Sequence, residues 1–143
     1  MKILIINGPN LNMLGKRDKD HYGTKTLEEL EKEIIDEAKK LKIDVECFQS
    51  NSEGEIVTKI QNAKEFDGII INAGAYTHTS LAIRDALEIF GKPVVEVHLS
   101  NIYARESFRH NSYISGIANG VIAGFKENSY ILALYGLYHI LKS

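Results

Sequence analysis

The chain has 143 residues, of which 44% are hydrophobic and 25% are charged, and its formal net charge at neutral pH is −2. This length predicts a single domain, residues 1–143, and the nearly balanced charge gives no reason to expect nucleic acid or a membrane surface as a partner. No apolar run approaches the roughly 20 residues that cross a bilayer. The single cysteine, Cys47, excludes an intrachain disulfide, and the N-terminus lacks a signal-peptide pattern, so a cytoplasmic location is expected.

The first predicted element is a buried strand at residues 2–7, which leads into the polar sequence Asn-Gly-Pro-Asn-Leu-Asn at residues 7–12. The following loop carries Arg17 and Tyr22. Such side chains can bind carbonyl and hydroxyl groups, hold an anion and, in the case of an acidified phenol, accept a proton. The glycine-flanked loop 16–23 can close over a ligand as a lid, although Tyr22 could also simply pack there.

The rest of the chain alternates amphipathic helices with apolar strands. Thr26 and Glu29 have the spacing of a capping box at the start of a helix, and Ser52 and Glu55 repeat that spacing. We expect helices at residues 27–41, about 56–63, 80–90 and 129–141, and strands at residues 43–48, 68–72, 93–97 and 120–125. Residues 99–119 are expected to mix loop with a short helix.

This alternation predicts an α/β fold, in which a flavodoxin-like, doubly wound sheet of five parallel strands carries helices on both faces. Ligands of such folds bind outside the carboxyl ends of the strands. Three strand ends carry polar segments, at residues 7–12, 72–79 and 96–101. We therefore expect one site at one edge of the sheet.

Glu96 and His98 are two residues apart on the fourth expected strand and therefore project to the same face. A carboxylate in this position could orient or charge an imidazole for proton transfer. The alternative, that Glu96 merely satisfies a partly buried histidine or a nearby arginine, stays equally open from the spacing alone.

Arginines and a helix start could supply anion binding at the same edge. Arg105 and Arg109 are four residues apart and would be neighbours on a helix. Arg17 could join them from the first loop to bind a carboxylate or polyol. The simpler interpretation is that these arginines are solvated surface residues. Thr79 or Ser80 is a suitable N-cap for the third helix, whose N-terminus favours an anion.

Two further features of these strand ends concern ligand binding. His78 could belong to the same cap as Thr79 and Ser80. Backbone amides near Leu99 and Ser100 could bind a carboxylate as a helix start does.

Several sequence motifs are absent. Neither G-x-G-x-x-G after the first strand nor G-x-x-x-x-G-K-[ST] occurs, so no nucleotide cofactor is expected. The five histidines show no paired-ligand spacing and G-x-S-x-G is missing, so neither a metal site nor a serine nucleophile is expected. Of the kinds of chemistry considered, proton transfer without a cofactor is the one that these residues still allow.

Four ordered blocks resemble the type II 3-dehydroquinate dehydratases, and the match runs nearly from end to end. The blocks are Asn-Gly-Pro-Asn-Leu-Asn-Met-Leu-Gly-Lys-Arg at 7–17 with Tyr-Gly at 22–23, Asn-Ala-Gly-Ala-Tyr-Thr-His-Thr-Ser at 72–80 with Arg-Asp at 84–85, Glu-Val-His-Leu-Ser-Asn at 96–101, and Ala-Arg-Glu-Ser-Phe-Arg at 104–109. Residues 116–134 look like the family's last strand and helix, with departures at 116, where proline often appears, and at 126–128, where glycines are common.

The resemblance implies reversible dehydration of 3-dehydroquinate to 3-dehydroshikimate in the shikimate pathway, by anti elimination through an enolate and without metal or Schiff base. It implies that Tyr22 is the base, with Arg17 making its phenol more acidic and the loop between them acting as a lid. His98 would be the acid that protonates the departing hydroxyl, assisted by Glu96. Asn10 would stabilise the enolate through a water molecule.

The resemblance also implies the substrate contacts and the assembly. Ring hydroxyls would be held by Asn72, His78 and Arg109, and the substrate carboxylate by backbone amides of Leu99 and Ser100. Asp85 would reach the site of a neighbouring subunit, in keeping with the family's dodecamer built from trimers.

Three alternatives follow from the same residues. A non-catalytic flavodoxin-like sensor of a cyclic polyol acid would be favoured by loss of Tyr22, Arg17 or His98, but all three are present. A phospho-receiver module is weaker, because the first strand leads into Asn-Gly-Pro-Asn and not into an acidic pair. A dehydratase of a related hydroxy acid would share the site. A Schiff-base mechanism is disfavoured because none of the three polar strand ends contains a lysine.

Overall fold

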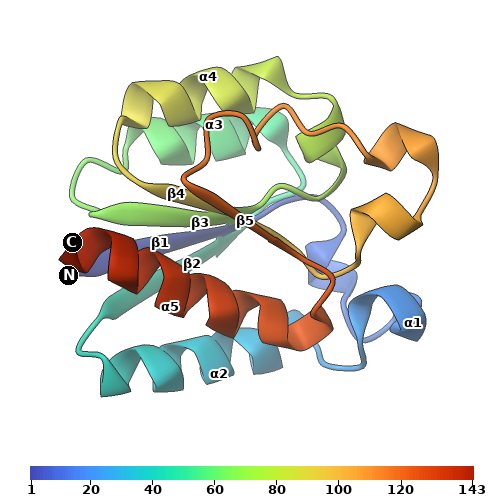
Figure 1. The fold of residues 1–143 in the computed structure, drawn as a ribbon, viewed down its shortest axis with the longest axis horizontal. Helices are drawn as coiled ribbons and strands as arrows, with labels where there is room; N and C mark the ends of the chain where they lie inside the picture. Colours follow the sequence, from blue (N-terminus) through green and yellow to red (C-terminus); the bar gives the residue numbers. More distant parts are fainter.

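A computed structural model describes all residues of the chain, 1–143. Its core is one parallel sheet of five strands in the order β2-β1-β3-β4-β5 (Figure 1). The strands are β1 (Lys2–Asn7), β2 (Asp44–Gln49), β3 (Gly68–Asn72), β4 (Val94–His98) and β5 (Gly120–Ala123). This is the flavodoxin-like α/β fold that the sequence predicts.

The helices cover both faces of the sheet. Helices α2 (Leu27–Lys40) and α5 (Ser129–Lys142) lie on one face, and α3 (Glu53–Gln61) and α4 (Leu81–Phe90) lie on the other (Figure 1). Alternate residues of β1 point to opposite faces, so Ile3 and Ile5 pack toward α2 and α5 while Leu4 and Ile6 pack toward α3 and α4. Burial on both faces explains the uninterrupted apolar runs of the central strands.

Side-chain caps fix where the helices begin. Thr26 and Glu29 form the complete capping box predicted for α2. The hydroxyl of Ser52 accepts the backbone N–H of Glu55 at the start of α3. Of the two candidates at α4, Ser80 is the cap, because its hydroxyl accepts the N–H of Ile83 at 2.9 Å.

Strand and helix boundaries differ in places from the sequence-based expectation. Strands β2 and β4 begin and end one residue later than predicted. Strand β5 ends at Ala123, not at residue 125, because Gly124 leaves the extended region with a φ of +97°. The expected helix within residues 99–119 is replaced by two single turns, η3 (Ile102–Ala104) and η4 (Ser107–Arg109), so Arg105 and Arg109 are not neighbours on one helix.

The loop after β1 contains a short helix, α1 (Lys19–Tyr22), which Asp18 caps and which ends at Gly23 with a φ of +78°. Figure 1 shows α1 and the turns of residues 102–109 at the carboxyl edge of the sheet, whereas both chain termini lie at the opposite edge. No helix combines the length and the hydropathy needed to cross a bilayer.

Candidate active site

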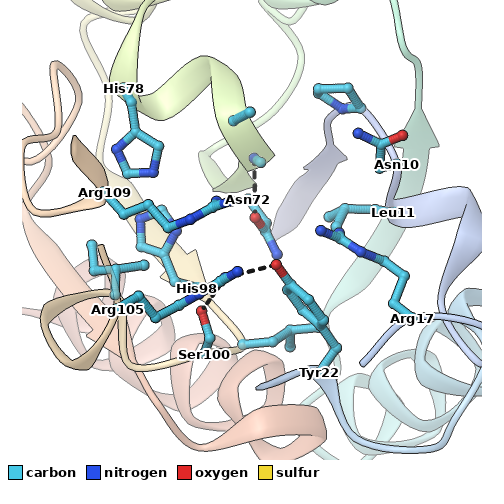
Figure 2. A pocket seen from close by; sticks show the side chains of 15 residues that line it. Asn10, Leu11, Arg17, Tyr22, Asn72, His78, His98, Ser100, Arg105 and Arg109 are labelled. Carbon is cyan, nitrogen blue, oxygen red and sulfur yellow. Dashed lines mark hydrogen bonds between the residues drawn. The ribbon is translucent and has the colours of Figure 1, made fainter. Parts of the chain in front are cut away.

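A pocket opens at the carboxyl edge of the sheet (Figure 2). Nine of the eleven residues predicted for the site line it, and they come from the first loop, α1, the ends of β3 and β4 and the turns that follow these two strands. They are Asn10, Arg17, Tyr22, Asn72, His78, His98, Leu99, Ser100 and Arg109. The other two do not line it: Glu96 lies buried behind His98, and Asp85 is exposed on α4.

Close backbone packing brings the loops after β1 and β3 together. A methyl group on Gly8 would lie only 2.3 Å from the carbonyl oxygen of Ala73, and Gly74, at a φ of +59°, packs against Pro9. Asn10 also has a positive φ, of 69°, and its backbone N–H donates to the Asn51 side chain at 3.1 Å. Only glycine allows the approach at Gly8, so that residue shapes the pocket wall.

Two arginines surround the phenol of Tyr22. Arg105 donates from Nη1 to the Tyr22 hydroxyl at 2.7 Å and to the Ser100 hydroxyl at 3.2 Å (Figure 2). The guanidinium carbon of Arg17 lies 3.8 Å from the centre of the Tyr22 ring, so Arg17 stacks on the ring face. Positive charge is therefore concentrated where a phenolate would form, and the direct hydrogen bond comes from Arg105.

Glu96 and His98 form a buried pair on β4, as their spacing predicts. Glu96 is fully buried, and its Oε2 is hydrogen-bonded to Nε2 of His98. Ser112 donates to the same oxygen at 2.9 Å, and Ser115 donates to Oε1 at 2.6 Å. Burial alone would raise the pKa of Glu96, but the hydrogen bond and charge of His98 and the two serine hydroxyls outweigh it and hold that pKa below its usual value.

The sequence allows His78 to belong to the cap at the start of α4, but its side chain is bonded elsewhere. Its Nδ1 lies 2.8 Å from the carbonyl oxygen of Asn111, and its ring stacks against that of His98 with 6.4 Å between centroids and an 18° angle between planes. A carbonyl oxygen can only accept, so Nδ1 of His78 carries the hydrogen. The two imidazoles thus stand side by side on the pocket wall.

Asn72 is fixed by partners that the sequence does not reveal. Its Nδ2 donates to the hydroxyl of Tyr130 at 3.1 Å, and its Oδ1 accepts the backbone N–H of Gly74 at 3.2 Å. The Tyr130 hydroxyl in turn donates to Oδ1 of Asn7. Complete burial raises the pKa of Tyr130, so its hydroxyl stays protonated and can donate. One N–H of Asn72 remains for a ligand.

Sequence reasoning missed three of these contributors and one contact of a fourth. Ser112, Ser115 and Tyr130 act from segments far from the residues that they hold. Arg105, which was expected to bind a carboxylate or polyol, lines the pocket and also donates to the Tyr22 hydroxyl. No local motif reveals these contacts, although the block that contains Arg105 does single out that arginine.

The fold and the pocket define an α/β protein equipped for acid–base chemistry at the carboxyl edge of its sheet. A model of the family described as dehydroquinase class II matches residues 1–138. The 3-dehydroquinate dehydratases of Prochlorococcus marinus strain NATL1A and Syntrophotalea carbinolica are 55% and 52% identical to the chain, with 99% of the chain covered in both cases and 99% and 97% of those proteins.

Solved structures agree with the sequence comparison. The crystal structure of type II dehydroquinase from Butyrivibrio crossotus superposes with a TM-score of 0.93 at 49% identity, and 100% of the chain and 98% of that structure are covered. The corresponding structure from Propionibacterium acnes gives a TM-score of 0.92 at 42% identity over 96% of both chains. The chain belongs to the type II dehydroquinase family.

Proposed function

We propose how the pocket carries out the reaction of this family, with Tyr22 as the base and His98 as the acid. The chain is a hydro-lyase of the shikimate pathway with 3-dehydroquinate dehydratase activity. One observation carries the assignment of roles: a phenol with two guanidinium groups and an imidazole with a buried carboxylate line the same pocket. An elimination of water needs such a pair, one group to take a proton and one to give a proton.

In the proposed sequence, the Tyr22 phenolate takes the proton from the carbon beside the ketone of 3-dehydroquinate, and the electron pair moves into an enolate. The enolate then re-forms the ketone and expels the hydroxyl, which leaves as water with a proton from His98. The anti course follows from base and acid acting from opposite sides of the ring, and the product is 3-dehydroshikimate. Arg105 and Arg17 stabilise the phenolate, and Glu96 stabilises the imidazolium.

The remaining pocket residues supply substrate contacts in this proposal. Asn10 stabilises the enolate through a water molecule, and backbone amides of Leu99 and Ser100 hold the carboxylate. The ring hydroxyls bind to Asn72, His78 and Arg109. The amide of Asn72 is already fixed by Tyr130. Fixing these donors before the substrate binds lowers the entropy lost at the transition state.

The lining of the pocket also supports a route without a Schiff base. Its fifteen lining residues include three arginines and no lysine. A Schiff base requires a lysine amine that reaches the substrate carbonyl. Acid–base elimination therefore fits the side chains in the pocket better than covalent catalysis.

We further propose that the chain assembles as a dodecamer built from trimers, with Asp85 reaching a neighbouring subunit's site. Leu81, Asp85 and Ile89 are spaced four residues apart on α4 and so share one exposed stripe, in which Leu81 is 56% and Ile89 is 77% exposed. Two large exposed apolar side chains on one helix face favour contact with another chain. Sedimentation of the intact protein tests this: twelve chains per particle is the expected result, and a monomer contradicts it.

We also propose that the chain forms one domain and is located in the cytoplasm. The five strands form a single sheet whose two apolar clusters together draw on residues from 3 to 137, which supports one folding unit over residues 1–143. The lone Cys47, half-buried and unpaired, fits a reducing compartment.

The direct test of the function is the ultraviolet absorbance of 3-dehydroquinate mixed with purified protein in buffer that contains a chelator. Absorbance of the conjugated enone product should rise, and it should rise equally after borohydride treatment of the protein with substrate present. Borohydride reduces a Schiff base to a stable amine, so inactivation by borohydride contradicts the proposed route. Folded protein that gives no rise contradicts the substrate assignment.

A further inference from the structure

The segment of residues 111–115 contacts the two pocket histidines or their partners at three points. The carbonyl oxygen of Asn111 faces Nδ1 of His78 at 2.8 Å. The hydroxyls of Ser112 and Ser115 reach the two carboxylate oxygens of Glu96, the partner of His98. One short stretch of chain therefore controls the surroundings of both imidazoles.

The direction of the hydrogen bond from Ser112 is fixed by its own turn. Its Oγ accepts the backbone N–H groups of Ile114 and Ser115, each at 3.1 Å. A hydroxyl has two acceptor sites and one donor, so these two bonds leave only its O–H, which points to Oε2 of Glu96 at 2.9 Å. Ser112 must donate to Glu96 and cannot accept from it.

This constraint sets the charge of Glu96. Its Oε2 receives the hydrogen of Ser112, and its Oε1 receives that of Ser115 at 2.6 Å, a distance typical of a hydroxyl that donates to a charged carboxylate. A carboxyl group with a donor on each oxygen is an acceptor only, which is the ionised form. The hydrogen between Glu96 and His98 therefore belongs to Nε2 of His98.

We propose that residues 111–115 hold the two stacked histidines in opposite tautomers, with the hydrogen on Nδ1 in His78 and on Nε2 in His98. The nitrogens without a protein partner are then Nε2 of His78 and Nδ1 of His98. The imidazolium that acts as the acid carries a second hydrogen on Nδ1, and transfer of that hydrogen to the departing hydroxyl leaves the neutral Nε2–H form of His98; this consequence rests on the proposed function. Ser115 acts on that step through Glu96 and is a positioning residue.

The tautomers can be read directly from ring nitrogen NMR of uniformly ¹⁵N-labelled protein, at a pH where the ring signals show that the imidazoles are neutral. Two-bond couplings from the ring carbon-bound hydrogens identify which nitrogen carries hydrogen. His78→Gln and His98→Gln variants assign the two rings. His110 is an internal reference, because its Nε2 faces the carbonyl oxygen of Arg105 at 2.9 Å and must carry hydrogen.

Ser115 offers a sharper variant than Ser112, because Ser112 also caps the turn and its loss would disturb the backbone. In Ser115→Ala, we expect the Nε2–H form of His98 to become a mixture of tautomers while His78 stays unchanged. The value of kcat should fall about tenfold with KM within about twofold, because the ring is less often correctly oriented. Ser115→Thr keeps the hydroxyl and should restore both the Nε2–H form of His98 and the original kcat. Ser107→Ala, which alters an exposed serine without a side-chain hydrogen bond, is the matched control and should change neither.

Each outcome decides the inference. A His98 ring with hydrogen on Nδ1 in the unmodified protein overturns it, as does a Ser115→Ala variant with unchanged tautomers and unchanged kcat. Opposite tautomers in a protein that does not dehydrate 3-dehydroquinate would support the inference and overturn the proposed function, so the two failures are distinguishable.

Discussion

The hydroxyl of Tyr22 and the guanidinium of Arg105 are joined by a 2.7 Å hydrogen bond although 83 positions separate them in the chain. The contact links helix α1 to the segment that follows β4. Because the same nitrogen also donates to Ser100, Arg105 connects the candidate base to the wall that carries the candidate acid. Arg105 therefore ties the position of the Tyr22 phenol to the segment that directly follows His98.

The first prediction concerns this link. Arg105→Lys keeps the positive charge but replaces the planar guanidinium, whose Nη1 donates to both Tyr22 and Ser100, with a compact ammonium on a flexible stem. We expect kcat to fall about 10- to 100-fold, in the range typical of a misplaced acid–base group. Steady-state rates from the enone absorbance give the value. An Arg105→Lys enzyme with an unchanged kcat would show that the hydrogen bond to Tyr22 has no part in catalysis.

The second prediction concerns Tyr130, whose hydroxyl links Asn7 to Asn72. Tyr130→Phe leaves buried amide groups without their partner, so the free energy of unfolding should fall by about 1–3 kcal/mol. The freed Asn72 side chain should also raise KM several-fold. Urea unfolding and steady-state kinetics measure the two effects. Tyr138→Phe on the same helix is the control, since the Tyr138 hydroxyl makes no hydrogen bond within the chain; equal losses in both variants would contradict the assigned role.

The third prediction concerns Gly8. A methyl group there would lie 2.3 Å from the carbonyl oxygen of Ala73, so Gly8→Ala must push the loops after β1 and β3 apart and should destabilise the protein by about 3 kcal/mol. Gly136→Ala is the matched control, because a methyl on that exposed helical position meets nothing within 4 Å and should stabilise the fold by about 0.5–1 kcal/mol. Urea unfolding of both variants checks the contrast, and a Gly8→Ala protein as stable as the original would contradict the packing argument.

The fourth prediction concerns pH. The folded-state pKa of Glu96 lies below its usual value of 4.5, so its contribution to stability is complete above that value and is lost as the pH falls through the lower, folded pKa. The free energy of unfolding should therefore drop more steeply below pH 4.5 in the original protein than in Glu96→Gln. Exposed carboxyls such as Glu106 titrate in both proteins, and their contributions cancel in the difference. If the free energy of unfolding falls equally with pH in the original protein and in Glu96→Gln, an ionised and stabilising Glu96 is contradicted.

The sheet could be predicted from sequence because its signals are local. Residues 68–71 of β3 form an apolar run between the polar Asp67 and Asn72, and Thr26 with Glu29 marks the start of α2. The boundary at Ala123 could not be predicted, because β5 ends where Gly124 turns away and packs against Asn101. Local periodicity carries no information about such a tertiary contact.

In the site, too, the local relationships could be predicted from the sequence and the tertiary contacts could not. Glu96 and His98 share a strand face two residues apart, so their pairing follows from the period of a strand. The partners of that pair could not be predicted, since Ser115 reaches Glu96 across 19 positions and only the folded path of residues 99–119 brings them together. The bond between Arg105 and Tyr22 likewise depends on how helix α1 lies against the segment that follows β4.

The division of roles between Tyr22 and His98 is the central claim, and isotope exchange tests it most directly. With 3-dehydroquinate in D₂O, His98→Asn should exchange the hydrogen on the carbon beside the ketone for deuterium while forming almost no enone, because the base still acts and the acid is missing. Tyr22→Phe should bind the substrate but neither exchange nor dehydrate it. Mass spectrometry of recovered substrate measures the exchange. Exchange or dehydration by Tyr22→Phe at the rate of the unmodified protein would contradict the assignment of Tyr22 as the base.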